Sequence, residues 1–430
     1  MQEITQKRLL ILGGSMATYA LVQNAQEMGV YVVVADMSDK GPAYKLANEG
    51  VKISTMDLDA LAAYIQNNKI DGVFCGPSEF NIQNTMKLCE MTGLPFYATK
   101  ELWDRCGNKE SLKGYCRDNG LPFIPEFHFD SADQIDQCPA DMFPVIVKPV
   151  DGCSSKGVAV CKNAGELKDA VDAALAFSAA GKVIVEKYID NGGRLFSFRY
   201  ILDEGNCYPY MLMDTYIADP VHKKCLVSAF SLIPSEYGQQ YMKTTDEKVR
   251  NMLCNMGLMH GTVFAQSLPY EGNFYCHDMG YRLSGGMTYT ISEALTGIND
   301  MKMMIRYALG GPICTQEEIG KMNPVPEGKV IGQLMLPLNA GTIAKISGVE
   351  AIQKEQSVIQ YIQYYHEGDT IPESVIGTLG QHFGRVSVMA NSKQELITII
   401  NRLQDGISIQ GVGGEEMYTM RFDTNRLYSK

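Results

Sequence analysis

The sequence lacks paired cysteines. Its 12 cysteines are scattered along 430 residues, and no two of them form a C-x-x-C pair. Because structural zinc sites use such pairs and disulfide frameworks use regular spacings, both are disfavoured, and a reducing compartment is indicated. We expect these side chains mainly to fill the core.

Excess positive charge and long apolar runs are also missing. The formal net charge of -11 disfavours nucleic acid as a partner, because a phosphate backbone needs a basic surface. No apolar run approaches the ~20 residues that span a bilayer, and the N-terminus lacks a signal-peptide pattern. We therefore expect a cytoplasmic protein with no nucleic-acid and no membrane partner.

Low-complexity tracts and a convincing internal repeat are absent as well. What is present is an alternation of strand-like and helix-like segments, which is typical of an α/β protein. A chain of 430 residues is too long for one ordinary core, so two or three different domains are expected.

The first hundred residues read as half of a Rossmann-type domain. A strand over residues 8–15 runs into a glycine turn, a helix follows over residues 16–28, and a second strand over residues 31–36 ends in an acid. Gly13-Gly14-Ser15 does not complete the G-x-G-x-x-G spacing, so an NAD-dependent dehydrogenase is a disfavoured alternative.

A further strand over residues 72–76 leads to Glu79 and a helix over residues 81–92. Glu79 then lies at the carboxyl end of the parallel sheet, where such sheets place ligands. The alternative is an acid at a helix start that the helix dipole favours.

A lysine and a loop of small residues follow a strand-like segment at residues 143–158. Strand geometry fixes the direction of Lys148, while the small residues after it let the backbone approach phosphate oxygens and offer donors. The pattern favours a nucleotide triphosphate site. A surface hairpin with a solvated lysine is the alternative.

The apolar run over residues 182–190 is closed by Glu186 and Lys187. Such a strand can present its backbone to the edge of adenine while apolar side chains enclose the ring. An ordinary core strand with a polar exit is the alternative.

Two later segments, residues 257–268 and 272–286, read as an antiparallel hairpin that turns at residues 269–273. On paired strands Gln266 and Asp278 lie side by side, and Arg282 follows shortly after. Oxygen ligands plus an arginine suit a magnesium-phosphate site.

The order of these parts resembles the ATP-grasp superfamily, in the branch that holds biotin carboxylase, the carbamoyl phosphate synthase large chain and bacterial L-amino-acid ligases. The missing repeat counts against a complete carbamoyl phosphate synthase, whose large chain carries two such halves. The resemblance implies ATP and Mg²⁺ as cofactors. It gives the first phosphate lysine as Lys109 and the second as Lys148, and it implies further nucleotide contacts from Ser154, Ser155, Gly157, Glu186, Lys187, Tyr188 and Ile189.

The metal hairpin departs from the family pattern. Where the family has glutamate, glutamate and asparagine, this chain has Gln266, Asp278 and Gly280. One carboxylate of two remains, although Gln266 still offers a carbonyl oxygen and Mg²⁺ often keeps several waters. A nucleotide-binding protein with a degenerate metal site is therefore one alternative.

The resemblance implies a three-domain architecture. The expected parts are an N-terminal Rossmann-like substrate domain over residues 1–104, an ATP-grasp core over residues 105–312 with a mobile lid at about residues 118–185, and a C-terminal α+β cap over residues 313–430.

The expected function is an ATP-dependent carboxylate-amine ligase that activates a small carboxylate, such as an amino acid, as an acyl phosphate. Arg282 and Lys148 are the expected catalytic residues, and Glu79, Arg282, Gly285 and Gly286 the expected substrate contacts. The partners are a small carboxylate and an amine, with a homodimer as one candidate assembly. A bicarbonate-activating enzyme is the second alternative, disfavoured because Leu283-Ser-Gly-Gly-Met287 stands where biotin carboxylases carry a valine-glutamate-histidine run.

Overall fold

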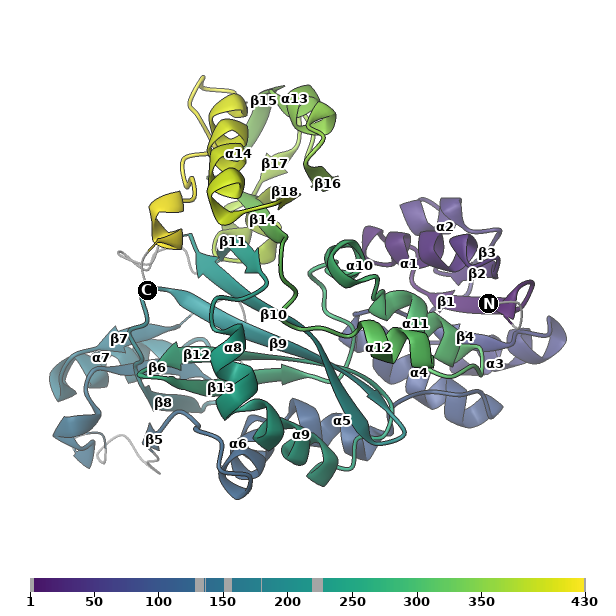
Figure 1. Cartoon of the computed structure of the whole chain (residues 1–430), viewed down its shortest axis with the longest axis horizontal. Helices are drawn as coiled ribbons and strands as arrows, with labels where there is room; N and C mark the ends of the chain where they lie inside the picture. The colour runs from purple at the N-terminus through teal and green to yellow at the C-terminus, as the bar shows by residue number, and fades with distance from the viewer. Residues whose placement is uncertain are drawn as a thin grey trace.

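The computed structural model describes residues 4–127, 135, 137–150, 157–178, 180–218 and 227–428. It shows a mixed α/β protein with four sheets, as the sequence predicts. In Figure 1 the N-terminal sheet lies to the right, a small sheet with α7 to the lower left, and the C-terminal elements stand above a long central sheet.

The N-terminal sheet is parallel, with the order β3-β2-β1-β4. Its strands are β1 (Arg8–Leu12), β2 (Tyr31–Ala35), β3 (Glu49–Val51) and β4 (Gly72–Phe74). After their first residue, β1 and β2 are apolar and buried, as expected for strands covered on both faces. The helices of this region are α1 (Met16–Glu27), α2 (Pro42–Leu46), α3 (Leu58–Asn67) and α4 (Glu79–Thr92).

The turn from β1 into α1 uses the acid at the end of β2. Gly13 has φ +101°, which a glycine tolerates, and Ser15 caps the helix. The carboxylate of Asp36 accepts hydrogen bonds from the amides of Gly14 at 2.7 Å and Ser38 at 2.8 Å. Asp36 therefore stabilises the turn itself.

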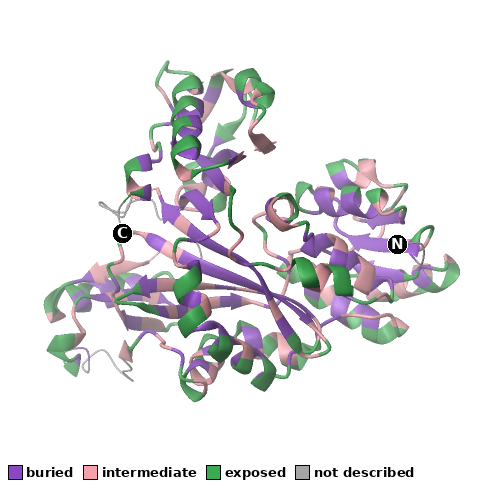
Figure 2. Cartoon of the chain, viewed as in Figure 1, coloured by how far each residue is buried: buried purple, intermediate pink, exposed green. Residues whose placement is uncertain are grey.

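The central sheet has eight antiparallel strands in the order β13-β12-β9-β10-β11-β14-β18-β16. Most of the residues in its inner strands are buried (Figure 2). The sheet passes without a break from the predicted core into the C-terminal segment, because β11 pairs with β14. Its strands are β9 (Arg194–Asp203), β10 (Asn206–Ile217), β11 (Ser228–Ile233), β12 (Gly261–Tyr270), β13 (Asn273–Gly280), β14 (Val330–Pro337), β16 (Val358–Gln363) and β18 (His382–Ala390).

The predicted lid region forms a four-stranded antiparallel sheet, β5-β8-β6-β7, covered by α7 (Ala164–Leu175). It has its own cluster of buried side chains, separate from the two larger cores. Helices α5 (Lys100–Gly107) and α6 (Lys109–Asp118) precede it. Its strands are β5 (Glu126–Phe127), β6 (Val145–Pro149), β7 (Ala159–Cys161) and β8 (Val183–Lys187).

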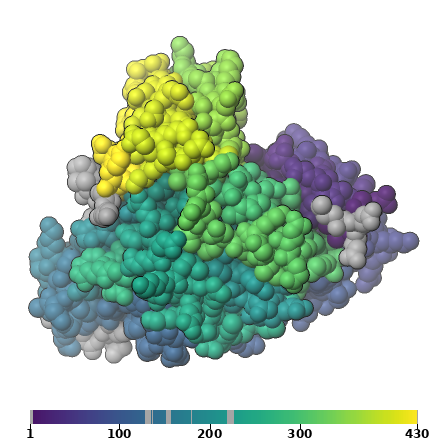
Figure 3. All heavy atoms as spheres, in the orientation of Figure 1, coloured from purple at the N-terminus to yellow at the C-terminus, as the bar shows by residue number. Residues whose placement is uncertain are grey.

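The C-terminal elements project from one side of the molecule in the space-filling view (Figure 3). They comprise the small sheet β17-β15-β19, with β15 (Gly341–Ser347), β17 (Thr370–Ile371) and β19 (Ser408–Gly411), and the helices α13 (Val349–Lys354) and α14 (Lys393–Gly406). The remaining α-helices are α8 (Gly238–Thr244), α9 (Asp246–Asn255), α10 (Tyr289–Thr296), α11 (Asp300–Ala308) and α12 (Gln316–Lys321).

Among the described residues, no helix combines the length and the apolar character needed to cross a membrane. Ten cysteines lie in this part of the chain. All ten are free thiols, and nine of them are buried.

Candidate active site

Two lysines converge on Glu186 at the edge of the lid. Lys148 on β6 and Glu186 on β8 are linked by a short hydrogen bond, and the other carboxylate oxygen of Glu186 accepts from Lys113 Nζ at 2.7 Å. Lys113 also bonds to Glu126 on β5. Since Glu186 is only 4% exposed, its charge needs both partners.

The pKa values of this group follow from its contacts. Burial alone would raise the pKa of Glu186, but the charges and hydrogen bonds of Lys148 and Lys113 outweigh it and hold the pKa below its usual value. Burial would lower the pKa of Lys113, yet its bonds to Glu126 and Glu186 raise it. Glu186 and Lys113 are therefore charged near neutral pH.

Lys109, the predicted first phosphate lysine, begins α6. The side chain of Asn108 caps this helix by accepting from Ser111 N at 2.9 Å. Lys109 is exposed and makes no ion pair with a described residue, so its ammonium group can take a ligand. Lys113 lies one helical turn further on, and the spacing of four residues is the signal by which it could have been found.

The predicted phosphate loop is described only at its end. Gly157 has φ +71°, and a methyl group there would lie 2.9 Å from Pro149 Cγ, so a larger residue would be strained. Ser154 and Ser155 lie outside the described residues.

The predicted adenine hinge already uses part of its backbone. The amide of Lys187 donates to Pro125 O at 2.9 Å, and that of Tyr188 donates to Pro144 O at 2.8 Å. The amide of the buried Ile189 makes no hydrogen bond to another described residue. A ring edge bound at this hinge would therefore meet Ile189 rather than the two amides before it.

Gln266 and Asp278 lie directly opposite each other on β12 and β13, as the hairpin predicts. A carboxylate and an amide oxygen are hard ligands that suit Mg²⁺ with additional waters. Among the described residues no group of three or more histidine, cysteine, aspartate or glutamate side chains could hold a metal. The donor set therefore fits Mg²⁺ only with weak charge compensation.

The third family position, Gly280, leaves space for an aromatic ring. It lies opposite Phe264, and a methyl group on Gly280 would lie 2.4 Å from the Phe264 ring. The Phe264 ring therefore occupies the space that the family's asparagine side chain would need.

A β-bulge beside Gln266 brings an unpredicted histidine to the same site. The register shifts between Gln266 and Ser267, and bulges re-aim side chains in this way. The Nδ1 atom of His277 is buried and has no hydrogen-bond partner. Burial lowers the pKa of His277 to about 4, helped by the charges of Lys148 and Lys109 and opposed by those of Asp278 and Glu186, so His277 is neutral near pH 7.

Arg282 and Glu79, 203 residues apart in the chain, form an ion pair at 2.9 Å. The guanidinium also lies over the Phe264 ring, 4.9 Å from its centroid. A cavity of about 230 Å³ opens beside this pair and is lined by Glu79, Trp103, Cys106, Gly107 and residues 278–282. Asp278 therefore borders the same space as the two predicted substrate residues.

The predicted glycine contacts differ from each other. The amide of Gly286 donates to Ser284 Oγ at 3.3 Å, so it is already engaged. No neighbouring atom would lie within 4 Å of a methyl group on Gly285, so this residue borders open space.

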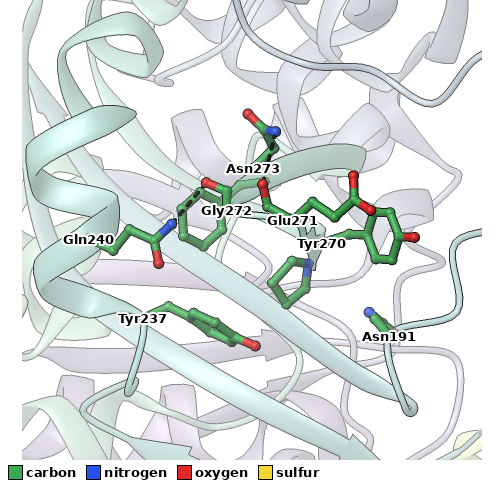
Figure 4. Close-up of a pocket in the computed structure, with 9 residues that line it drawn as sticks. Asn191, Tyr237, Gln240, Tyr270, Glu271, Gly272 and Asn273 are labelled. Carbon is green, nitrogen blue, oxygen red and sulfur yellow. Dashed lines mark hydrogen bonds between the residues drawn. The ribbon is translucent and has the colours of Figure 1, made fainter. Parts of the chain in front are cut away.

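A second cavity, of about 280 Å³, lies at the tip of the β12–β13 hairpin (Figure 4). Gln240 donates to Gly272 O at 2.8 Å across it, and Tyr237 and Tyr270 flank it. None of the predicted site residues lines this cavity. The charged groups around Arg282 favour the cavity beside that residue as the candidate active site.

Comparison with known proteins places this site in a family context. Residues 109–315 match the family described as carbamoyl-phosphate synthase L chain, ATP binding domain. A formate-dependent phosphoribosylglycinamide formyltransferase from Pseudomonas savastanoi pv. phaseolicola (strain 1448A / Race 6) is 30% identical over 191 residues, which cover 43% of this chain and 48% of that protein. The chain thus spans about half the length of this curated relative.

A wider match is the enzyme of the same name from Sulfurisphaera tokodaii (strain DSM 16993 / JCM 10545 / NBRC 100140 / 7), with 23% identity over 367 residues, 80% of this chain and 84% of that protein. The structure is similar to that of L-amino acid ligase from Bacillus licheniformis, with a TM-score of 0.75 and 20% identity over 95% of this chain and 99% of that one. The family match and the shared architecture agree with the resemblance seen in the sequence. Residues 109–315 are therefore similar to the carbamoyl-phosphate synthase L chain ATP-binding domain, and the fold of nearly the whole chain is similar to that of the L-amino acid ligase.

Proposed function

We propose that the protein is an ATP- and Mg²⁺-dependent carboxylate-amine ligase. ATP-grasp proteins are ligases that use ATP with Mg²⁺. The observation that carries the proposal is the position of Asp278. Asp278 borders the cavity that is also lined by Arg282 and Glu79. The charges of the lid residues Lys148 and Glu186 affect the pKa of its neighbour His277, so the lid lies close to this cavity.

The chain's own residues divide the work. Lys109 and Lys148 bind the triphosphate, while Gln266 and Asp278 would hold Mg²⁺, which supplies further positive charge. Arg282 positions the carboxylate beside the terminal phosphoryl group and stabilises the negative charge that develops when the amine attacks the acyl phosphate. No nucleophilic side chain is needed.

The substrates follow from the cavity and from the relatives. A volume of about 230 Å³ suits a small acid, and the Arg282–Glu79 pair offers one cationic and one anionic contact, as an amino acid requires. The similar proteins are named for a formate-dependent formyl transfer to phosphoribosylglycinamide and for ligation of amino acids. Both names describe a small acid joined to an amine.

The experiment is a screen of amino acids and other small carboxylates, each with and without amines, for release of ADP and phosphate. Release that requires both a carboxylate and an amine supports the ligase. Release stimulated by bicarbonate alone would favour the carboxylase alternative.

One observation favours a second candidate, a nucleotide-binding protein with little turnover. Phe264 fills the space beside Gly280, so the metal site lacks its third family ligand. Tight binding of an ATP analogue, with no ADP release for any acid and amine, would support this candidate.

A further inference from the structure

Two buried arginines of the central sheet lack a carboxylate partner. Arg199 on β9 is 4% exposed and Arg385 on β18 is 9% exposed, and neither forms an ion pair with a described residue. Arg194, on the same strand as Arg199 and 7% exposed, contacts Asp214 at 2.6 Å and Glu236 at 2.7 Å. An unpaired buried guanidinium is costly, so the difference calls for a ligand.

Arg199 is held by neutral groups only. Its guanidinium donates to Thr288 Oγ1 and to Ser284 Oγ, the latter at 3.1 Å, and its Nε is buried with no partner. Asp300 is near enough to feel its charge, but Asp300 instead accepts from Tyr210 at 2.7 Å. The hydroxyl groups orient the guanidinium without neutralising it.

Arg385 has even fewer contacts. Its side chain makes no hydrogen bond to a described residue, its Nε is buried without a partner, and its guanidinium lies 5.9 Å from the Tyr364 ring centroid. A methyl group on Gly286 would lie 3.9 Å from Arg385 Nη1 and 3.5 Å from Ser284 Oγ. Both arginines therefore approach the same short turn, residues 284–288.

This turn adjoins the candidate active site. It begins two residues after Arg282, and Arg199 lies opposite Phe264, whose ring contacts the Arg282 guanidinium. Paired residues share a face of a sheet, so these groups lie on one side of β9 and β12. A cavity of about 270 Å³ also borders the turn, at Met287, and reaches Ile362, which lies opposite Arg385 on β16.

We propose that Arg199 and Arg385 bind an anionic group of the substrate, a carboxylate or a phosphate, at the turn 284–288. Guanidinium groups bind both anions through paired donors, and the Ser284 and Thr288 hydroxyls can add to them. The proposal rests on the proposed ligase function, because it assigns the anionic group to one of the two substrates of that reaction. That substrate carries an anionic group besides the carboxylate that is activated.

The test uses inorganic phosphate and succinate as probes, with thermal unfolding and calorimetry as readouts and no ATP present. Four proteins are compared: wild type, Arg385→Met, Lys148→Ala and the control Arg402→Met, whose arginine is exposed and paired with Glu355. At least one anion should stabilise the wild type, Lys148→Ala and Arg402→Met alike. Arg385→Met should bind it at least ~10-fold more weakly, as expected when a charge-assisted bond is lost.

The protein without anion provides the second readout. Arg385→Met keeps the apolar stem and removes an unpaired buried cation, so its Tm should equal or exceed that of the wild type. An arginine that served only to hold the fold would lower the Tm when replaced. Arg385→Lys should bind the anion with intermediate affinity, because it keeps the charge and loses the planar fork.

Three results would overturn the proposal. The first is no stabilisation of the wild type by either anion, and the second is stabilisation that survives in Arg385→Met. The third is stabilisation lost only in Lys148→Ala, which would place the anion in the nucleotide site.

The ligase function is tested separately, by ADP release. Anion binding without ADP release leaves the anion site standing and rejects the ligase. ADP release without anion binding does the reverse. Where both are observed, the ADP-release KM values for alanine, aspartate and O-phosphoserine identify which anion the substrate carries.

Discussion

At the residue scale, Lys148 on β6 donates a hydrogen bond from its ammonium group to Glu186. Lys148→Ala should lower the rate of ADP formation by about 10²–10³-fold, the usual cost of removing one electrostatic contact to the reacting group. The fold should persist, because Lys113 still neutralises Glu186. Lys162→Ala, an exposed lysine of the lid, is the matched control. Unchanged ADP formation in folded Lys148→Ala would reject the assignment.

Glu186 links stability to pH. Its pKa is held below the ordinary 4.5, so its contribution is fully present at neutral pH and is lost as the pH falls below 4.5 through the lowered value. Glu186→Gln should cost about 3 kcal/mol of unfolding free energy at neutral pH, because it removes the carboxylate that pairs with Lys148 and leaves Lys113 with Glu126 alone. Urea unfolding measures both quantities.

The difference between wild type and Glu186→Gln should shrink in acid. Glu317→Gln, which breaks an exposed ion pair with Lys321, should change stability little at either pH. A loss for Glu186→Gln that stays constant down to about pH 3.5 would show that the pKa of Glu186 is not lowered in the native protein.

Arg282 donates to one oxygen of Glu79 through both Nε, at 3.3 Å, and Nη2, at 2.9 Å. Arg282→Lys keeps the charge but loses this planar fork, so turnover should fall by about 10–100-fold while ATP binding changes little. Steady-state kinetics and nucleotide titration separate the two effects. An equal loss in both would place Arg282 on the nucleotide.

At the scale of elements, the β12–β13 hairpin sets the metal requirement. Asp278 is the one carboxylate that we propose as a Mg²⁺ ligand there, so Gln266→Glu should lower the Mg²⁺ concentration needed for half-maximal rate, by about tenfold if the added charge contributes ~1.4 kcal/mol. Gln240→Glu at the hairpin tip is the control for a general charge effect. An unchanged requirement, or full activity in EDTA, would remove the metal from this hairpin.

Element prediction succeeded where local signals were strong. The helix after β4 was predicted from residue 81 and begins at Glu79, because Ser78 caps it. The strands β9, β10 and β11 were not predicted, although they form the centre of the long sheet. Strands buried on both faces, with polar residues such as Ser197 and Arg199 inside, show no alternation to read.

At the scale of the whole molecule, the lid packs around its own small core and meets the body through α6 and the Glu186 ion pairs. Such a unit opens with a lower free energy than the main cores. Hydrogen exchange in β6, β8 and α7 should therefore be faster than in β9 and β10, and it should slow when an ATP analogue binds. Exchange that is equally slow with and without the analogue would contradict a closing lid.

The sequence by itself determined the order of the parts, because strand-turn-helix patterns, the lysine on β6 and the hairpin with Gln266 and Asp278 are all local features. Tertiary structure decided which charges meet. Lys113 reaches Glu186 across 73 residues and Arg282 reaches Glu79 across 203. It also brought Arg199 and Arg385 to one turn, and it filled the space beside Gly280 with Phe264. Whether a buried charge is paired, and whether a space is open, depends on side chains from distant strands, and no local pattern records them.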